Sequence, residues 1–291
     1  MKEPLDRLYQ HVRSLLTARY GAAEASAVAF ALLEDLYGVG RTDVLLGKDK
    51  EFSAEERNDF EEIVKKIAEG LPMQYAVGRA LFCGRYFKVT PDVLIPRVET
   101  EAVPLQLPSP EGSARVLDCG TGSGCIAITI ALEHPDWDVE AWDISDAALA
   151  VARENAEALG AKNVRFEHRD ILAEAEATGP FAGGGKQEKS FHYIVSNPPY
   201  ICNKEAAEME PHVLDHEPHT ALFVPDNDPL LFYRALAEIG RARLVAGGCL
   251  FVECNRAYTE ETAALFRTYD FMNVCTINDC FGVPRFVQGW R

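Results

Sequence analysis

From about residue 113 the sequence alternates short apolar segments with longer amphipathic ones, and this alternation restricts the fold more than any other feature. Strands that alternate with helices along a chain form a parallel sheet covered on both faces. The strand candidates are RVLDCG, VEAWDIS, VRFEHRD, FHYIVSN, GCLFVECN, FMNVCTIND and PRFVQGW, and the helix candidates are CIAITIALEH, DAALAVARENAEALG and DPLLFYRALAEIGRARL. The sequence therefore predicts an α/β domain over residues 109–291, with a doubly wound, mostly parallel seven-stranded sheet.

The chain before residue 73 is expected to form a separate helical domain, residues 1–72. Apolar residues recur at helical spacing from Leu5 to Leu16, and again in EASAVAFALLEDLYG. A third helix is expected to begin at Ser53, because Ser53 and Glu56 have the spacing of a capping box. Its buried stripe is expected to be Phe60, Ile63, Val64 and Ile67. These helices carry no motif for chemistry, which indicates a docking or packing module.

Two other segments follow neither the helical pattern of the first domain nor the alternation of strands and helices in the second. Residues 73–108 are expected to link the two domains, because ALFCGRYFKVTPDVLIPR is aromatic and β-branched and is punctuated by Gly84 and Pro91. Such a pattern predicts a β-hairpin over residues 75–97. Residues 174–190, EAEATGPFAGGGKQEKS, are rich in Gly, Ala and Lys and predict a mobile surface insertion.

The charge of the chain restricts its partners. The net charge is −16, and residues 101–291 alone carry 15 basic and 29 acidic residues. Such a surface repels phosphate groups, so neither nucleic acid nor a membrane is an expected partner. The eight cysteines show no C-x-x-C pair and no zinc-ligand spacing, so we expect reduced thiols and no metal. The N-terminus lacks an apolar signal core, which favours a cytoplasmic protein.

The segment VLDCGTGSGC places a glycine loop between a strand and a helix. Gly120, Gly122 and Gly124 let the backbone approach a ligand closely, and the following helix offers free N–H groups. We therefore expect these glycines, with Thr121 and Ser123, to bind a cofactor. The G-x-G-x-G spacing disfavours an NAD-dependent dehydrogenase, whose motif is one residue longer. Many α/β proteins also contain such a turn without a ligand.

Acidic residues end the next two strands. Asp143 is placed to accept hydrogen bonds from both ribose hydroxyls of a nucleoside, although it could instead cap the helix that follows. Asp170 could accept from an adenine amino group while Ile171 covers a face of the ring, and a plain surface role for Asp170 is the alternative. Because open α/β sheets bind nucleosides where parallel strands end, we expect all three residues to bind the cofactor.

The most specific motif is Asn197-Pro198-Pro199-Tyr200, directly after an apolar strand. Two prolines stiffen the backbone and remove two N–H donors while their carbonyls remain as acceptors. The Asn197 side chain adds another acceptor oxygen, and Tyr200 offers a flat face. Together they suit a planar –NH2 group, as in a carboxamide or an adenine. The alternative is a rigid turn after a strand.

In this order the motifs resemble those of S-adenosylmethionine-dependent N-methyltransferases. More closely, the chain resembles the release factor glutamine methyltransferases, the PrmC/HemK family. PMQYAVGRALFCGRYFKV followed by VLIPRVETE is similar to that family's linker, and EPHTALFV followed by PLLFYRAL is similar to its segment after NPPY. The resemblance runs from about residue 70 to the C-terminus. It implies a Rossmann-like methyltransferase domain with a small N-terminal helical domain, joined by the hairpin linker.

The resemblance implies methyl transfer from S-adenosylmethionine, leaving S-adenosylhomocysteine, to the glutamine nitrogen of a Gly-Gly-Gln motif in a class 1 peptide chain release factor. Asn197 Oδ1 and the Pro198 carbonyl are expected to accept the two amide hydrogens, with Tyr200 packed on the amide plane. Pro199 completes the substrate site, and Asn197 also borders the cofactor. Residues 1–72 are expected to hold the release factor, and the enzyme is expected to act as a monomer.

Two segments depart from the family pattern. PRVETE at residues 96–101 stands where P-R-P-E-T-E is common, and VECN at residues 252–255 stands where L-E-x-G is frequent. Arg97, Glu99 and Glu101 either line the substrate groove or form a structural ion-pair cluster.

Two rival functions use the same residues. An adenine-N6 nucleic-acid methyltransferase would hold the exocyclic amine of a flipped base at NPPY, but it needs a basic surface that this chain lacks. A catalytically silent binding module would keep the fold, but the intact glycine loop, Asp143 and NPPY argue against it.

Overall fold

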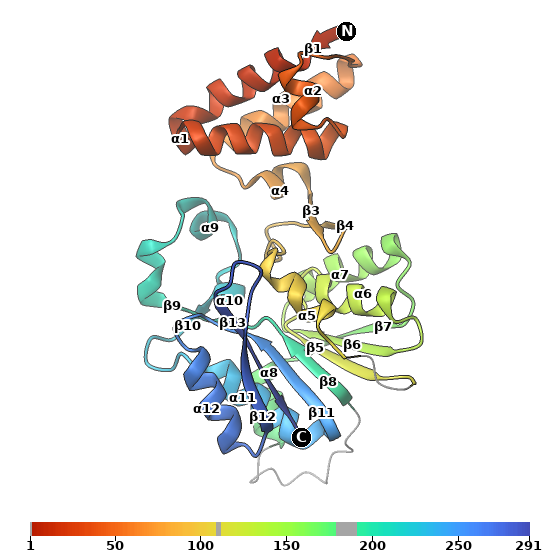
Figure 1. Ribbon diagram of the computed structural model, residues 1–291, viewed down its shortest axis with the longest axis vertical. Helices are drawn as coiled ribbons and strands as arrows, with labels where there is room; N and C mark the ends of the chain where they lie inside the picture. Colours follow the sequence, from red (N-terminus) through yellow and green to blue (C-terminus); the bar gives the residue numbers. More distant parts are fainter. Residues whose placement is uncertain (1, 109–111, 179–190) are drawn as a thin grey trace. The chain divides into compact units, whose positions relative to one another are not determined.

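The structure, a computed structural model, describes residues 2–108, 112–178 and 191–291 (Figure 1). The chain divides into two compact units, which are described one at a time. The first runs to Arg79 and also includes Pro211–His216, and the second comprises Ala80–Glu210 and Glu217–Arg291. In the part of the chain that is described, no helix combines the length and apolar character needed to cross a membrane.

The first unit is helical, as the sequence predicts. Helix α1 (Leu5–Tyr37) contains both of the first two predicted helices and is interrupted at Gly21, where φ is 73° and ψ is 168°. Helix α3 (Ala54–Glu69) begins at the predicted capping box, in which Ser53 and Glu56 satisfy each other's backbone N–H groups. The sequence analysis missed four short elements: β1 (Lys2–Pro4), α2 (Arg41–Leu45), β2 (Asp49–Glu51) and α4 (Met73–Val77). Each is five residues or fewer, too short for a periodic pattern to emerge.

The core of the first unit follows the predicted helical faces. Phe60, Val64 and Ile67 are at most 1% exposed, and they pack with Leu8, Val12, Leu16, Leu32 and Leu33. Ile63 of α3 is only partly buried, and Leu15 of α1 is 46% exposed. The buried stripes of α1 and α3 are therefore narrower than the apolar pattern of the sequence predicts.

The predicted hairpin is shorter than expected. It consists of β3 (Arg79–Phe82) and β4 (Arg85–Lys88), joined by Cys83 and Gly84. Both turn residues have positive φ, 46° and 72°, as a tight two-residue turn between twisted strands requires. The expectation of a hairpin over residues 75–97 is wrong at both ends, because α4 precedes it and a loop follows it.

All seven predicted strands form one sheet, in the order β12-β13-β11-β8-β5-β6-β7 (Figure 1). The strands are β5 (Arg115–Cys119), β6 (Asp138–Asp143), β7 (Val164–His168), β8 (Phe191–Ser196), β11 (Leu244–Glu253), β12 (Met272–Asn278) and β13 (Pro284–Trp290). Strand β13 runs antiparallel to both of its neighbours, and the other described pairings are parallel. The predicted doubly wound, mostly parallel sheet is therefore confirmed.

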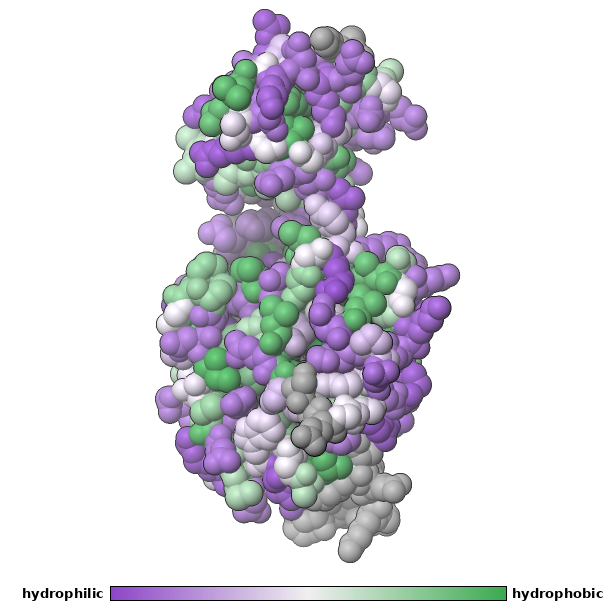
Figure 2. Space-filling view, turned by 45° about the vertical axis from the view of Figure 1, so that its right-hand side comes forward, coloured by the Kyte–Doolittle hydropathy of each residue, from purple (hydrophilic) through white to green (hydrophobic). Residues whose placement is uncertain are grey.

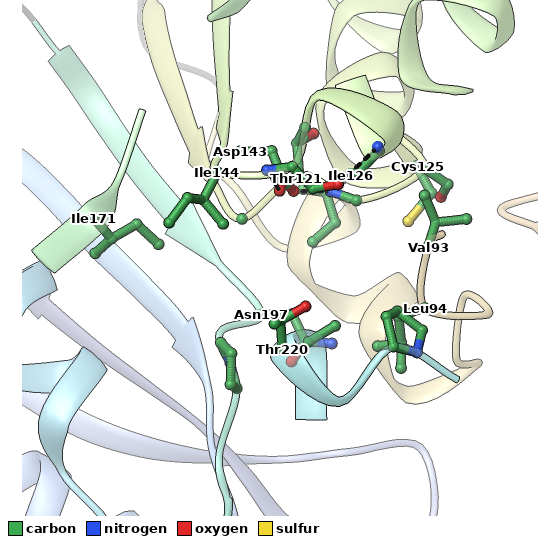
Figure 3. Close-up of a pocket in the computed structure, with 18 of the residues that line it drawn as sticks. Val93, Leu94, Thr121, Cys125, Ile126, Asp143, Ile144, Ile171, Asn197 and Thr220 are labelled. Atoms are coloured by element: carbon green, nitrogen blue, oxygen red, sulfur yellow. Dashed lines mark hydrogen bonds between the residues drawn. The ribbon is translucent and has the colours of Figure 1, made fainter. Parts of the chain in front are cut away.

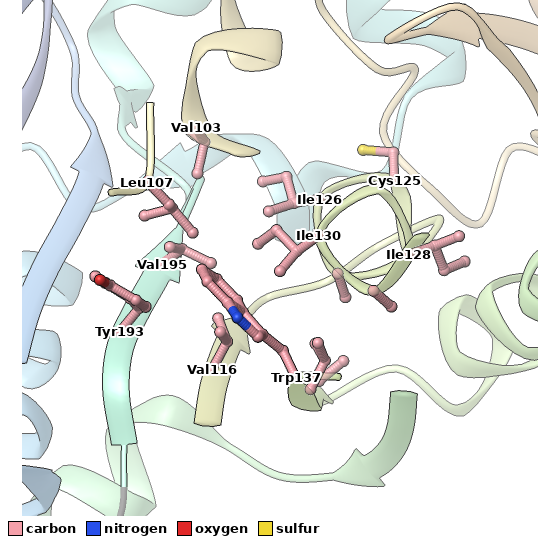
Figure 4. Packing of buried hydrophobic residues seen from close by; sticks show 14 of the residues in the cluster. Val103, Leu107, Val116, Cys125, Ile126, Ile128, Ile130, Trp137, Tyr193 and Val195 are labelled. Atoms are coloured by element: carbon pink, nitrogen blue, oxygen red, sulfur yellow. The ribbon is translucent and has the colours of Figure 1, made fainter. Parts of the chain in front are cut away.

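Successive strand residues point to opposite faces of this sheet, and each face has its own core. Val116 and Val195 belong to one cluster, and Leu117 and Ile194 belong to the other. In the first cluster the Trp137 ring stacks on Tyr193 with centroids 5.5 Å apart (Figure 4). The helices with buried residues in the first cluster are α5 (Ala102–Leu105), α6 (Cys125–Glu133) and α7 (Asp146–Leu159). Those in the second are α8 (Ile171–Thr178), α11 (Leu231–Arg243) and α12 (Thr259–Thr268).

Several predictions about the connections need correction. Residues 174–178 of the expected insertion belong to α8, because Ile171 and Ala175 pack into the core and extend the helix. The remainder, 179–190, lies outside the described residues. The sequence analysis also missed these elements: η1 (Glu99–Glu101), α5 (Ala102–Leu105), β9 (Ile201–Cys202), η2 (Asn203–Glu208), α9 (Pro211–His216), α10 (His219–Leu222), β10 (Phe223–Val224), α8 and α12.

On the face of the molecule seen in Figure 2, hydrophilic residues surround separate hydrophobic patches. This mixed surface agrees with a chain whose charged residues make up 25% of the sequence. The apolar residues that define the fold lie in the clusters on either side of the sheet.

Asn155 on α7 ties the hairpin to the glycine loop. Its Oδ1 accepts from the Lys88 backbone N–H at 2.7 Å, and its Nδ2 donates to the carbonyls of Lys88 and Ser123 at 3.0 and 2.9 Å. The side chain is only 2% exposed, so water cannot replace these bonds once they are lost.

We expect Asn155→Ala to lower the free energy of unfolding by about 2–4 kcal/mol, because the buried Ser123 carbonyl and the part-buried N–H and carbonyl of Lys88 lose this partner. The neighbouring substitution Glu154→Ala removes only an exposed ion pair with Lys88 and should cost less than about 1 kcal/mol. Urea unfolding of both variants measures the difference. Equal losses would show that the Asn155 bonds contribute no more than a surface ion pair.

Candidate active site

A cavity of about 310 Å³ lies where β5, β6, β7 and β8 end (Figure 3). Its wall includes the glycine loop, the residues after β6 and β7, and the start of NPPY. Two further segments also line it. One is part of the linker, from Asp92 to Thr100, where Arg97 was a candidate groove residue, and the other is part of the segment Pro218–Ala221, which was not predicted. In Figure 3, Asn197 and Thr220 lie on the side of the cavity opposite Thr121 and Asp143.

The glycine loop is held against the neighbouring strand by its backbone. The N–H groups of Gly120 and Thr121 both donate to the carbonyl of Trp142 at 2.9 Å. Gly120, Gly122 and Gly124 have φ values of 75°, 55° and 81°, a backbone conformation that other residues rarely adopt. A Cβ atom at Gly122 would meet nothing within 4 Å, so this residue leaves space at the cavity wall.

Gly124 has a different surrounding from the other two glycines. A Cβ atom there would lie 2.8 Å from Ile128 Cδ1 and 3.1 Å from Ala152 Cβ, so this glycine permits close packing of α6 on α7. The cavity wall includes Gly120, Thr121, Gly122 and Ser123 but not Gly124. The structure thus brings four of the five predicted loop residues to the cavity.

Asp143 lies at the end of β6 and lines the cavity. Its Oδ2 accepts from the Gly122 N–H at 2.8 Å and its Oδ1 accepts from the Ser145 N–H at 2.9 Å. Burial raises the pKa of Asp143, and these backbone bonds act in the opposite direction. A carboxylate has about four acceptor positions, so acceptor capacity remains for a ligand beside the backbone bonds from Gly122, Ser145 and Ile144. The capping role that was the alternative for Asp143 is taken by Ser145, whose Oγ accepts from the Ala148 N–H.

Asp170 and Ile171 also reach the cavity wall. Asp170 Oδ1 accepts from the Leu172 N–H at 2.8 Å and so caps the start of α8. Ile171 is 8% exposed, and its Cδ1 lies 3.9 Å from the Cβ position of Gly120. The two residues therefore present a carboxylate beside an apolar surface, as the sequence predicts.

The structure divides the NPPY motif into two parts. Asn197 and Pro199 line the cavity, whereas Pro198 is buried and Tyr200 is not part of the wall. The hydroxyl of Tyr200 donates to Glu253 Oε1 at 3.1 Å, and burial raises the pKa of Tyr200 well above its ordinary value. The predicted packing of Tyr200 on a substrate amide therefore remains a prediction.

The backbone of Tyr200 is fixed at both of its polar groups. Its N–H donates to the carbonyl of Leu222 at 3.2 Å, next to the parallel pairing of β9 with β10. Its carbonyl accepts from Asn255 Nδ2, also at 3.2 Å. Asn255 stands where the L-E-x-G pattern has Gly, and here it supports the NPPY turn.

Arg97, Glu99 and Glu101 were expected either to line the substrate groove or to form a structural ion-pair cluster, and they have different surroundings in the structure. Arg97 lines the cavity, and its Nη2 donates to both oxygens of the buried Glu217 at 2.7 and 2.8 Å. Glu101 accepts from the Cys83 N–H in the hairpin turn at 2.8 Å. Glu99 lies in η1 and is not part of the cavity wall.

The residues that were not predicted from the sequence include Thr100, which lines the cavity, and its partner Glu253, which does not. They are 2% and 1% exposed and share a hydrogen bond of 2.6 Å. Both lie in segments compared with the family pattern, PRVETE and VECN, so motif position was the available signal. Nothing in the sequence indicates that residues 153 positions apart are in contact.

The buried carboxylate of Asp118 contacts the glycine loop. Its Oδ2 accepts a hydrogen bond from Thr121 Oγ1 at 2.7 Å. Burial raises its pKa to about 7, and the hydrogen bond from Thr121 lowers it in part. The group supports the loop through Thr121, and Asp118 itself is not part of the cavity wall.

Comparison with known proteins agrees with this geometry. The Methyltransferase small domain family matches residues 100–215, and the PrmC N-terminal domain family matches residues 7–78. A release factor glutamine methyltransferase of Bacteroides thetaiotaomicron is 43% identical over 99% of this chain and 100% of its own length. Another, of Flavobacterium psychrophilum, is 35% identical over 94% of each chain. The hMettl16 catalytic domain, solved with MAT2A 3′UTR hairpin 6, has 15% identity and a TM-score of 0.52 over 90% of this chain and 91% of its own, which shows a shared fold.

The sheet order, the glycine loop and the domain match define a methyltransferase of the S-adenosylmethionine-dependent class. Relatives of 43% and 35% identity span nearly the whole chain. The chain therefore belongs to the release factor glutamine methyltransferase family.

Alanine substitutions at Gly122, which lines the cavity, and at Gly124, which lies between two packed helices, test the role of the glycine loop. Gly122→Ala should cost about 1–2 kcal/mol of stability for its left-handed backbone and should weaken S-adenosylmethionine binding at least tenfold, because its Cβ enters the cavity. Gly124→Ala should cost about 1–3 kcal/mol more, because its Cβ overlaps two packed helices. Thermal unfolding and isothermal titration measure both effects. Unchanged cofactor affinity in Gly122→Ala would rule out the loop as the cofactor site.

Proposed function

We propose that this chain transfers a methyl group from S-adenosylmethionine to the side-chain nitrogen of the glutamine in the Gly-Gly-Gln motif of class 1 peptide chain release factors. The observation that carries the proposal is the position of Asn197. It shares one cavity with the glycine loop and with Asp143, so a side-chain amide and a nucleoside-type ligand can be held together.

The cavity fits the proposed cofactor in its chemistry. The open space at Gly122 admits close approach to the backbone, and Asp143 offers lone pairs for ribose hydroxyls. Asp170 and Ile171 offer an acceptor and an apolar surface for a purine. S-adenosylmethionine bound there supplies an electrophilic methyl group on a sulfonium.

The chain itself contributes positioning. A carboxamide nitrogen is a weak nucleophile, because its lone pair is delocalised into the carbonyl. Asn197 Oδ1 and the Pro198 carbonyl hold its two hydrogens, so that the nitrogen faces the methyl donor. Such placement can supply about 7–11 kcal/mol of a reaction barrier. The same two acceptors stabilise positive charge as it develops on the nitrogen.

The first unit is proposed to bind the release factor. Residues 7–78 of it match the PrmC N-terminal domain family, and its helices carry no motif for chemistry. We propose that the enzyme acts as a monomer in the cytoplasm, and that nucleic acid is not its substrate, since residues 101–291 carry 14 more acidic than basic residues.

Transfer of label from S-adenosylmethionine tests the proposal. The full chain is incubated with a release factor, with the same factor carrying Gln→Ala in its Gly-Gly-Gln motif, and with duplex DNA. Label on the intact release factor alone is the expected result. Label on DNA would favour the adenine-N6 reaction, and label on the Gln→Ala factor would exclude that glutamine as the only acceptor.

The cofactor role of Asp143 predicts a loss of affinity. Asp143→Ala removes the proposed ribose acceptor and the partner of the Gly122 N–H, and should weaken S-adenosylmethionine binding at least tenfold. Asp146→Ala, three residues on, removes only an exposed contact with His168 and should leave the affinity within about twofold. Isothermal titration compares the two. An unchanged Kd for Asp143→Ala would contradict the ribose assignment.

The proposed acceptor role of Asn197 predicts a loss of turnover with little change in cofactor affinity. Asn197→Ala should lower kcat by about 100-fold or more, because the amide loses one of its two acceptors. The Kd for S-adenosylmethionine should stay within about threefold. Single-turnover methylation beside isothermal titration gives both values, and wild-type turnover in this variant would refute the role.

A further inference from the structure

A chain of hydrogen bonds, centred on the buried pair Thr100–Glu253, connects Asn197 to the end of β11. Asn197 Nδ2 lies 3.2 Å from Thr100 Oγ1, and Thr100 Oγ1 lies 2.6 Å from Glu253 Oε2. The other oxygen of Glu253 accepts from the Tyr200 hydroxyl at 3.1 Å. Three segments distant in sequence therefore meet at the cavity wall: η1 and NPPY line it through Thr100 and Asn197, and Glu253 of β11 contacts Thr100 without lining it.

The ionised carboxylate sets the direction of every bond in this chain. A carboxylate only accepts hydrogen bonds, so the Thr100 hydroxyl must donate its one hydrogen to Glu253. Thr100 Oγ1 can then only accept from Asn197. The amide of Asn197 must meet that acceptor with its nitrogen, since an oxygen in the same place would face another lone pair.

This direction leaves Asn197 Oδ1 free of the network. The side-chain oxygen is then the atom available to accept from a substrate –NH2 group, as the proposed reaction requires. A reversed amide would present its own –NH2 to the substrate –NH2, and two donors repel one another. The orientation of a single amide thus decides whether the site holds a carboxamide nitrogen.

We propose that Glu253 is a positioning residue, which acts through Thr100 to hold the Asn197 side chain with Oδ1 as the acceptor for the substrate amide. The inference rests on the proposed function for its substrate, but the hydrogen-bond direction exists without substrate. It extends the active machinery to a carboxylate that does not line the cavity.

Protonation of Glu253 reverses this direction. The charged groups that face it are Arg285 on β13, which also pairs with Asp279, and Glu99 in η1; the Tyr200 hydroxyl is its titratable neighbour. Arg285 favours the carboxylate, and Glu99 opposes it. Burial is the largest influence and raises the pKa of Glu253 to about 6.

Below this pH the neutral acid can donate to Thr100, whose hydroxyl is then free to donate onward to the oxygen of Asn197. The amide turns, and its acceptor is lost to the substrate. Turnover at saturating substrates should therefore fall as the pH drops through about 6.

Matched variants of the full-length protein test the proposal. Glu253→Gln keeps the shape but can donate as well as accept, and Thr100→Val keeps the shape without the hydroxyl. Each should lower kcat about 10- to 100-fold, with KM for the release factor and Kd for S-adenosylmethionine within about threefold. Thr100→Ser restores the hydroxyl and should recover most of the turnover lost in Thr100→Val. Thermal unfolding confirms that the variants are folded.

A second measurement needs no substrate. The side-chain 15NH2 signal of Asn197, assigned by its absence in Asn197→Asp, should titrate near pH 6 in the wild-type protein and not in Glu253→Gln. The pH profile of wild-type kcat should show an acidic limb at the same position, and this limb should be absent in Glu253→Gln.

The outcomes separate this proposal from the proposed function. If the wild type does not methylate the release factor, the proposed function fails, and the Asn197 signal still decides whether Glu253 directs the amide. If the wild type is active while Glu253→Gln keeps full turnover and Asn197 does not titrate, the positioning role is wrong. A loss of kcat together with a titrating Asn197 signal supports it.

Discussion

Parallel pairing of β5 with β6 and with β8 is the constraint on which the site depends. Because these strands point the same way, the glycine loop, Asp143 and Asn197 emerge at one edge of the sheet although they lie far apart in sequence. Burial of Val116 and Leu117 on opposite faces fixes the register of the central strand. A shift by one residue would exchange the two cores and move every residue that follows the strand.

The site combines a rigid acceptor edge, the NPPY turn, with a glycine loop that leaves space for a ligand. At the loop, positive φ at Gly122 keeps space open for a ligand, whereas Gly124 serves the packing of two helices. At the acceptor edge, Tyr200 is held by Leu222, Asn255 and Glu253, so its neighbours in NPPY have little freedom. Catalysis by positioning needs this rigidity, because a displacement of about 1 Å can cost a factor of about 100 in rate.

The sequence predicted the central sheet well because each strand is bounded by turn residues and because α7 and α11 bury only one side. It also located Asp143 and Asn197, which follow strands directly. It did not locate Thr100 or the segment near Thr220, because these reach the cavity by tertiary contact from loops and short helices. Tyr200 shows the same limit: the motif indicated its importance, but only the fold shows its hydroxyl turned toward Glu253.

In the proposed reaction, Asn197 Oδ1 accepts a hydrogen of the substrate amide within the cofactor cavity. A crystal structure of the chain with S-adenosylhomocysteine and a Gly-Gly-Gln peptide would show this contact. We expect the glutamine nitrogen at about 2.7–3.2 Å from Asn197 Oδ1, with Asn197 Nδ2 still on Thr100. A glutamine bound elsewhere, or with its carbonyl oxygen facing Asn197, would contradict it.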